Sequence, residues 1–173
     1  MNPGLFILGE LSDADADWLA EQGRLESVDP GLPLIQQGVP IEEVHLVLRG
    51  RFLVSQRGEV RDLGSIGPGE MMGEMSFLDS RLPVADVRAG EERCEVLSLP
   101  RSALQRRLDA EPDLAARFYR GLARILSARL RDALAESAGL DPERASPTEP
   151  DERSLLERGE ARLERLAARV GAG

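Results

Sequence analysis

The spacing of hydrophobic and polar positions changes twice along the 173 residues of the chain. Residues 24–100 carry short apolar runs separated by glycines and prolines, and in one run Val44, Leu46 and Leu48 alternate with other side chains before Gly50. A period of two that ends at a glycine is typical of strands joined by a tight turn. This segment therefore predicts a compact antiparallel sheet.

Helical patterns flank the predicted sheet on both sides. In residues 1–23, Ser12 precedes several aspartates, as expected for the cap of a short leading helix. Residues 101–138 predict two helices, and the second runs from Pro112 to about Ser137. Apolar residues recur along it at spacings of three and four, namely Leu114, Phe118, Leu122, Ile125, Leu126, Leu130 and Ala133. Such spacing predicts one apolar stripe along the helix.

The last part of the chain reads as a linker and a terminal helix. Residues 139–152 are acidic and rich in proline, and an amphipathic helix is predicted over 153–173 from the capping box Ser154 to Glu157. Its heptad-like register is short, so the helix docks on the body, pairs with a partner or frays. The predicted class is α+β: an antiparallel β-roll of the double-stranded β-helix or jelly-roll type, flanked by an N-terminal helix and a long C-terminal helix, plus the short terminal helix.

Charge and composition argue against nucleic acids and membranes as partners. The formal net charge of −9 opposes a surface that lies along DNA or an anionic membrane, and all 22 basic residues are arginines. The apolar run at the start lacks the basic segment of a secretory signal, and no run approaches the length of a membrane span. We therefore expect a cytoplasmic protein that binds neither DNA nor membranes.

The chain offers little that could perform catalysis. His45 is the only histidine, and Cys94, the only cysteine, rules out an internal disulfide and a multi-cysteine zinc site. For His45 a packing or surface role is favoured, and for Cys94 that of a small buried hydrophobe. We find no nucleophile beside a base, no phosphate-binding loop and no cluster of metal ligands. The sequence predicts no enzyme, no catalytic residue, no metal site and no cofactor.

One stretch carries chemistry that binds an anion and a sugar. After Gly67 and Gly69, Gly73 precedes a one-turn helix, where backbone N–H groups can approach a negative charge. Glu74 follows directly, and a carboxylate accepts a hydrogen bond from a ribose hydroxyl more strongly than a neutral acceptor does.

This stretch resembles the cassette of the cyclic nucleotide-binding domain family, the β-roll of Crp/Fnr-type regulators, protein kinase A regulatory subunits and gated channels. The resemblance covers about residues 12–137 and rests on the turn at Gly50, the glycine pair, Gly73-Glu74, the strand ending at Ala89 and the long helix. It implies a regulatory domain with its cassette at 67–89 and a cyclic nucleotide such as cyclic AMP as the ligand. The predicted ligand-binding residues are Gly73, Glu74, Met75, Ser76, Arg81, Val84 and Ala85.

The cassette departs from the family at the residue that pairs with the phosphate. Pro83 stands where the family has an arginine and Val84 where a small or hydroxyl-bearing residue is usual, while Asp86 adds a negative charge. Losing a charged hydrogen-bond partner costs about 1.5–3 kcal/mol, so we expect weak or absent binding of cyclic AMP. Arg81, two positions earlier, is the candidate replacement.

Two functions fit these observations. In the first, ligand occupancy of the roll is coupled to the C-terminal helices; in the second, the roll is a ligand-independent module for dimerisation or protein interaction. The helix 112–137 is the expected homodimer contact, and 153–173 the expected site for a protein partner. A transcription factor is disfavoured, because the 35 residues after residue 138 leave no room for a winged helix-turn-helix.

Overall fold

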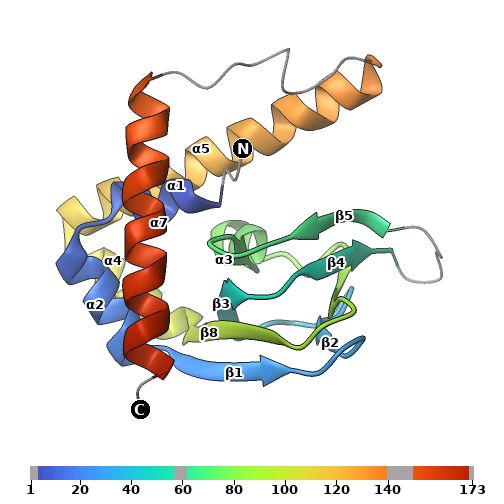
Figure 1. Cartoon of the computed structure of the whole chain (residues 1–173), viewed down its shortest axis with the longest axis horizontal. Coiled ribbons are helices and arrows are strands. Elements are labelled where there is room, and N and C mark those ends of the chain that lie inside the picture. Colours follow the sequence, from blue (N-terminus) through green and yellow to red (C-terminus); the bar gives the residue numbers. More distant parts are fainter. Residues whose placement is uncertain (1–3, 57–61, 140–149, 172–173) are drawn as a thin grey trace.

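Two four-stranded antiparallel sheets form a roll (Figure 1). The computed structural model describes residues 4–56, 62–139 and 150–171. The strands are β1 (Arg24–Val28), β2 (Pro33–Ile35), β3 (Glu43–Arg49), β4 (Phe52–Ser55), β5 (Asp62–Ile66), β6 (Met71–Met72), β7 (Asp86–Ala89) and β8 (Cys94–Pro100). One sheet has the order β1-β8-β3-β6 and the other β2-β7-β4-β5, which confirms the predicted antiparallel roll.

Alternation along β3 separates two hydrophobic clusters. Val44, Leu46 and Leu48 pack with the helices, whereas Val47 packs with residues of the opposite sheet inside the roll. Because successive strand side chains point to opposite faces, His45 shares the roll face with Val47. The sheet β1-β8-β3-β6 is therefore the layer between the helices and the interior of the roll. Cys94 is fully buried in the roll cluster, as predicted.

Two helices precede the roll, where one was predicted. They are α1 (Leu5–Glu10) and α2 (Asp13–Gln22), and α2 starts at the predicted Ser12 cap, whose hydroxyl accepts from the Asp15 N–H at 3.2 Å. The extra helix is formed by the apolar run Leu5 to Leu8, none of which is more than 3% exposed. A helix that is apolar all round is stable only when other elements cover it. Here α5 and α7 do so, and the sequence pattern of α1 alone could not show this.

The long helix α5 (Pro112–Ser137) follows α4 (Arg101–Ala110) and carries the predicted stripe. Leu114, Phe118, Leu122 and Ile125 are at most 4% exposed, so the first turns pack on the body as expected. At Gly121 an added Cβ would lie 2.6 Å from the Cα of Ile7, which shows how closely α5 crosses α1. Further along, Leu130 and Leu134 are each 61% exposed. The stripe therefore continues beyond the surface that covers it.

The terminal helix α7 (Pro150–Gly171) docks on α1 and α2, one of the three outcomes left open by the sequence (Figure 1). It begins at Pro150 rather than at residue 153, because proline suits the first helical turn and two acidic residues follow it there. Leu155 and Leu166 are 5% and 1% exposed. Its apolar side is thus covered within the chain, and a partner would meet the remaining face.

Ion pairs flank this apolar contact. The guanidinium groups of Arg162, Arg165 and Arg169 pair with the carboxylates of Asp13, Asp17 and Glu21 at 2.9, 2.8 and 2.7 Å respectively. Of the predicted linker 139–152, residues 140–149 lie outside the described residues. In the part of the chain that the structure describes, no helix is both long and apolar enough to cross a membrane.

Candidate functional site

Gly73 opens the short helix α3 (Glu74–Asp79), and its backbone requires a glycine. Its φ angle of 83° lies in the left-handed region, which other residues rarely adopt. An added Cβ would lie 2.7 Å from Cδ1 of Ile41 and 3.3 Å from the carbonyl oxygen of Glu43. Gly73 therefore fixes the close approach of the cassette to the start of β3, whatever its role toward a ligand.

The carboxylate of Glu74 meets an arginine from the long helix. Glu74 is 6% exposed, and Nη1 of Arg129 forms a short hydrogen-bonded ion pair with its Oε1. The Nη2 of Arg129 lies 3.5 Å from Oε1 of Glu70, a residue whose other carboxylate oxygen accepts the Gly67 N–H at 2.6 Å. A single guanidinium from α5 thus joins the cassette helix to the turn before it.

Arg129 is the functional candidate that the sequence reading missed. It lies four residues after Ile125 and seven after Leu122, both 1% exposed, so helical spacing places it on the buried side of α5. Its buried Nη2 makes no hydrogen bond within the described residues. The sequence could have predicted that Arg129 lies on the buried side of α5. Its pairing with Glu74 could not be predicted, because it depends on how α5 crosses the roll.

Of the remaining predicted ligand residues, some are buried or partly buried and others are exposed to solvent. Ser76 is 6% exposed, and its carbonyl oxygen accepts from Nη2 of Arg101 at 2.6 Å. Met75 and Val84 are 54% and 66% exposed, while Ala85 is partly buried. The side chain of Arg81 is 84% exposed, and its Nε lies 3.6 Å from a carboxylate oxygen of Asp79. In this conformation Arg81 therefore extends into solvent, and its role as a replacement for the missing arginine stays a prediction.

The end of the cassette is held by backbone contacts. The carbonyl oxygen of Pro83 accepts the Gly38 N–H at 2.9 Å, and Oδ1 of Asp86 accepts the Gln37 N–H at 2.7 Å. The carboxylate that was expected to repel an anion thus already accepts a structural hydrogen bond. Pro83 itself offers no donor, because proline has neither an N–H nor a polar side chain.

Comparison with known proteins decides the family. The family model described as "Cyclic nucleotide-binding domain" matches residues 25–111, half of the chain. The chain belongs to the cyclic nucleotide-binding domain family. The match contains the roll, the cassette and α4, whereas α5 and α7 lie beyond it. The domain thus includes the predicted ligand residues but not Arg129.

Two curated relatives match part of the chain. The chain is 36% identical over 130 residues to glutaminase 2 of Bradyrhizobium diazoefficiens, covering 71% of this chain and 20% of the relative. It is 38% identical over 109 residues to the cyclic AMP receptor protein of Thermus thermophilus, covering 60% of this chain and 47% of the relative. The chain therefore spans about a fifth and about half of these two proteins. The similarity to glutaminase 2 involves only a small part of that protein.

A solved structure shows the same fold. A cyclic nucleotide-binding domain from Methylobacillus flagellatus superposes with a TM-score of 0.68 at 22% identity, over 78% of this chain and 80% of that one. The superposition shows the predicted fold. The regulatory, cyclic nucleotide-binding-like character expected from the sequence is supported by the family match and by the similarity to the cyclic AMP receptor protein.

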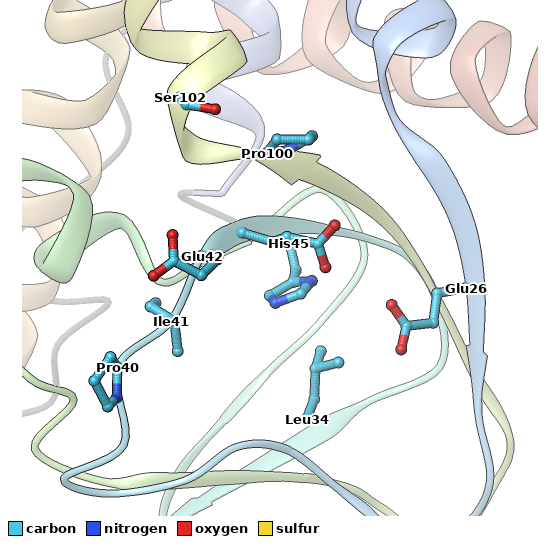
Figure 2. Close-up of a pocket in the computed structure, with 9 residues that line it drawn as sticks. Glu26, Leu34, Pro40, Ile41, Glu42, His45, Pro100 and Ser102 are labelled. Atoms are coloured by element: carbon cyan, nitrogen blue, oxygen red, sulfur yellow. The ribbon is translucent and has the colours of Figure 1, made fainter.

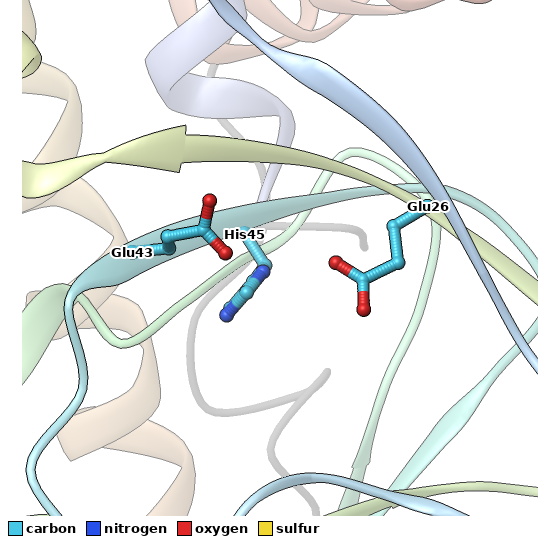
Figure 3. Close-up of side chains that lie close together, drawn as sticks. All are labelled: Glu26, Glu43 and His45. Atoms are coloured by element: carbon cyan, nitrogen blue, oxygen red, sulfur yellow. The ribbon is translucent and has the colours of Figure 1, made fainter.

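A second polar region of the domain lies at the mouth of the roll. A pocket of about 520 Å³ opens there between β1, β3, the start of α4 and the loop before β3 (Figure 2). Its lining residues are Glu26, Leu34, Pro40, Ile41, Glu42, Glu43, His45, Pro100 and Ser102. Burial lowers the pKa of His45, and the nearby carboxylates of Glu43 and Glu26 oppose this effect only in part (Figure 3). Burial therefore favours the neutral form of this imidazole.

Proposed function

We propose that this chain is a regulatory domain in which the state of the cassette is coupled to α5 through the ion pair between Glu74 and Arg129. The pair carries the proposal because it joins the residue expected to accept a ribose hydroxyl to the helix that leaves the roll. A ribose hydroxyl donating to Glu74 competes with Arg129 for the same carboxylate. Occupancy of the cassette would thereby release or re-aim a guanidinium carried by α5.

The proposed ligand is a cyclic nucleotide such as cyclic AMP, bound weakly. Glu74 supplies the carboxylate proposed for the ribose, but Pro83 supplies no donor to the phosphate and Arg81 extends into solvent. The freed guanidinium of Arg129 is the nearest described cation to Glu74 and offers the phosphate an alternative partner. No cofactor is required by this scheme.

Calorimetric titration of cyclic AMP into two proteins tests this function. Restoring the family residues with the double substitution Pro83→Arg and Val84→Ser should raise the affinity about 10- to 100-fold over the unaltered chain, the equivalent of one charged hydrogen bond. Adding Glu74→Gln should remove most of that gain. If the double variant binds no better than a Pro83→Ala control, the cassette is not a cyclic nucleotide site.

A second candidate function rests on the exposed end of the apolar stripe. Leu130 and Leu134 on α5 are each 61% exposed. On α3, Met75 is 54% exposed and Leu78 is 45% exposed. Exposed apolar groups of this kind are typical of a surface that binds a protein, and a homodimer through α5 would cover them. Sedimentation should then show a dimer that the double substitution of Leu130 and Leu134 by glutamine converts to a monomer, without cyclic nucleotide in either sample.

A further inference from the structure

The terminal helix α7 crosses α1 where both helices carry a glycine (Figure 1). A Cβ added at Gly159 of α7 would overlap the carbonyl oxygen of Leu5 and lie 2.9 Å from its Cβ. A Cβ added at Gly9 of α1 would overlap the carbonyl oxygen of Leu155. The two backbones therefore touch only because these side chains are absent. Since glycine destabilises the interior of a helix relative to alanine, Gly159 is explained by the docking of α7 and not by its helical stability.

An arginine of α7 holds the corner between α1 and α2. Nη1 of Arg162 donates to the carbonyl oxygens of Leu8 and Gly9, where α1 ends, at 2.9 and 3.0 Å. Its Nε donates to Oδ1 of Asp13, where α2 begins, at 2.9 Å. The Arg162 side chain is only 15% exposed. One guanidinium thus supplies donors to the last turn of α1, whose carbonyl groups lack partners within the helix.

Both α1 and α7 reach the turn Gly67–Glu70 at the start of the cassette. A Cβ added at Gly69 would overlap Cδ2 of Leu5 on α1 and lie 3.6 Å from Cδ2 of Leu163 on α7. On its other side the turn is bonded to the roll, because the Gly69 N–H donates to the carbonyl oxygen of Val47 at 2.8 Å. The turn is therefore held between β3 and two helices that lie outside the roll.

The contacts of α7 suit a helix that can be released as a unit. Leu155 and Leu166 are buried, whereas its other apolar side chains that contact the core, Leu156, Leu163 and Val170, are only partly buried. The ion pairs of Arg165 and Arg169 with Asp17 join side chains that are 50%, 42% and 26% exposed. Exposed ion pairs each contribute little to stability and are screened by salt. Neither sheet includes a residue of α7, so the strand pairing of the roll does not require it.

We propose that α7 docks reversibly and that its docking keeps the start of the cassette rigid. In the docked state, Leu163 of α7 and Leu5 of α1 cover Gly69, and Arg162 fixes the corner between α1 and α2. Release of α7 removes Leu163 from the turn and uncovers one side of α1, so the turn Gly67–Glu70 opens more often. No nucleotide takes part in this step. The inference therefore goes beyond the proposed function and does not depend on it.

Hydrogen–deuterium exchange of the full chain, followed by NMR, tests the proposal with Gly159→Ala. The added methyl group overlaps the Leu5 carbonyl oxygen and prevents docking, although alanine favours the helix itself. Exchange should become at least about tenfold faster in α7 and at the amides of Gly69 and Glu70. Gly171→Ala is the matched control on the same helix, because an added Cβ there has no neighbour within 4 Å. It should leave both sets of rates unchanged.

A change of charge gives a second test that remains valid if Gly159→Ala does not fold. Arg165→Glu places a carboxylate beside Asp17 and should speed exchange both in α7 and at Gly69. Adding Asp17→Arg restores an attractive pair and should return both rates part of the way. If α7 exchanges faster in either variant while Gly69 does not, α7 does not act on the cassette and the proposal is wrong. If α7 itself stays protected in both variants, its docking does not depend on these contacts and the proposal is equally wrong.

Discussion

The cassette and the mouth of the roll are two acidic regions that each pair with one arginine, but the two arginines are anchored differently. At the cassette, Arg129 has a side chain 32% exposed and meets Glu74, whose side chain is 7% exposed. At the mouth, Arg24 is 61% exposed and meets carboxylates about one-third exposed. The same pairing chemistry is therefore buried in one region and largely solvated in the other.

The difference follows from the elements that carry the two arginines. Arg129 lies one turn beyond Ile125 on α5, a helix fixed by its contact with α1. Arg24 begins the edge strand β1, and its side chain is 61% exposed. Displacing Arg24 thus moves a side chain, whereas displacing Arg129 acts on a helix of 26 residues. The proposed coupling therefore concerns the cassette, whose arginine belongs to a long helix, and not the mouth of the roll.

The largest change in unfolding free energy should come from removing the buried side chain that fixes α5 one turn before Arg129. Ile125→Ala removes a side chain that is 1% exposed and should cost about 2–5 kcal/mol of unfolding free energy, since a cavity remains. Urea unfolding followed by circular dichroism measures this loss. Leu130→Ala, at 61% exposure, is the matched control and should change stability by no more than about 0.5 kcal/mol. Equal costs would mean that α5 is not anchored at Ile125.

Removing Arg129 itself should have the next largest effect. In Arg129→Ala, Glu74 keeps a buried carboxylate without its partner, which should cost about 1–3 kcal/mol in the same unfolding experiment. Combining it with Glu74→Gln should recover part of that loss, because the amide carries no charge to leave unpaired. A double variant as unstable as the sum of the two singles would show that Glu74 and Arg129 do not interact.

Arg24→Ala should cost less than about 1 kcal/mol, because solvated ion pairs contribute little to stability. The comparison between the two regions requires this value to be clearly smaller than that for Arg129→Ala. Similar losses for the two variants would contradict it. The loss should also shrink in high salt, which screens exposed charges more than buried ones.

The smallest effect concerns acid and His45 at the mouth of the roll. Burial lowers the pKa of folded His45, while the unfolded residue takes up a proton near its ordinary value of 6.5. The unfolded state therefore binds more protons in the window below about pH 6.5, and stability decreases as the pH falls toward the folded pKa. The charged groups facing His45 are Glu43, Glu26 and Arg24. Melting curves from pH 7 to pH 5 should show a decline that is weaker in His45→Gln.

The sequence predicted the parts of this fold that depend on local pattern. Alternation in β3, the Ser12 cap and the apolar spacing in α5 follow from the geometry of strands and helices. Helix α1, which was not predicted, shows the limit of this approach. Its uniformly apolar residues have no helical period, and the helix is stabilised by the packing of α5 and α7 around it.

The residues of the candidate sites also differ in how far the sequence could predict them. Gly73 and Glu74 stand in one short motif, so the sequence revealed them together. Arg129 is 55 residues from Glu74 in sequence, and Glu26 and His45 lie on β1 and β3, with β8 between these strands in the sheet. For His45, which has no second histidine or nucleophile near it in sequence, a packing or surface role was predicted, and the structure shows it buried and hydrogen-bonded to Ser98. Only the register of β1, β8 and β3 brings its neighbours together.

Hydrogen–deuterium exchange of α5 tests the central claim most directly. In the Pro83→Arg, Val84→Ser variant, saturating cyclic AMP should change the exchange of α5 amides around Arg129, between Leu122 and Leu134. Adding Arg129→Gln should abolish that change while calorimetry still detects binding. If cyclic AMP binds to the double variant and exchange in α5 stays the same, the cassette is not coupled to α5 through Arg129 and the account is wrong.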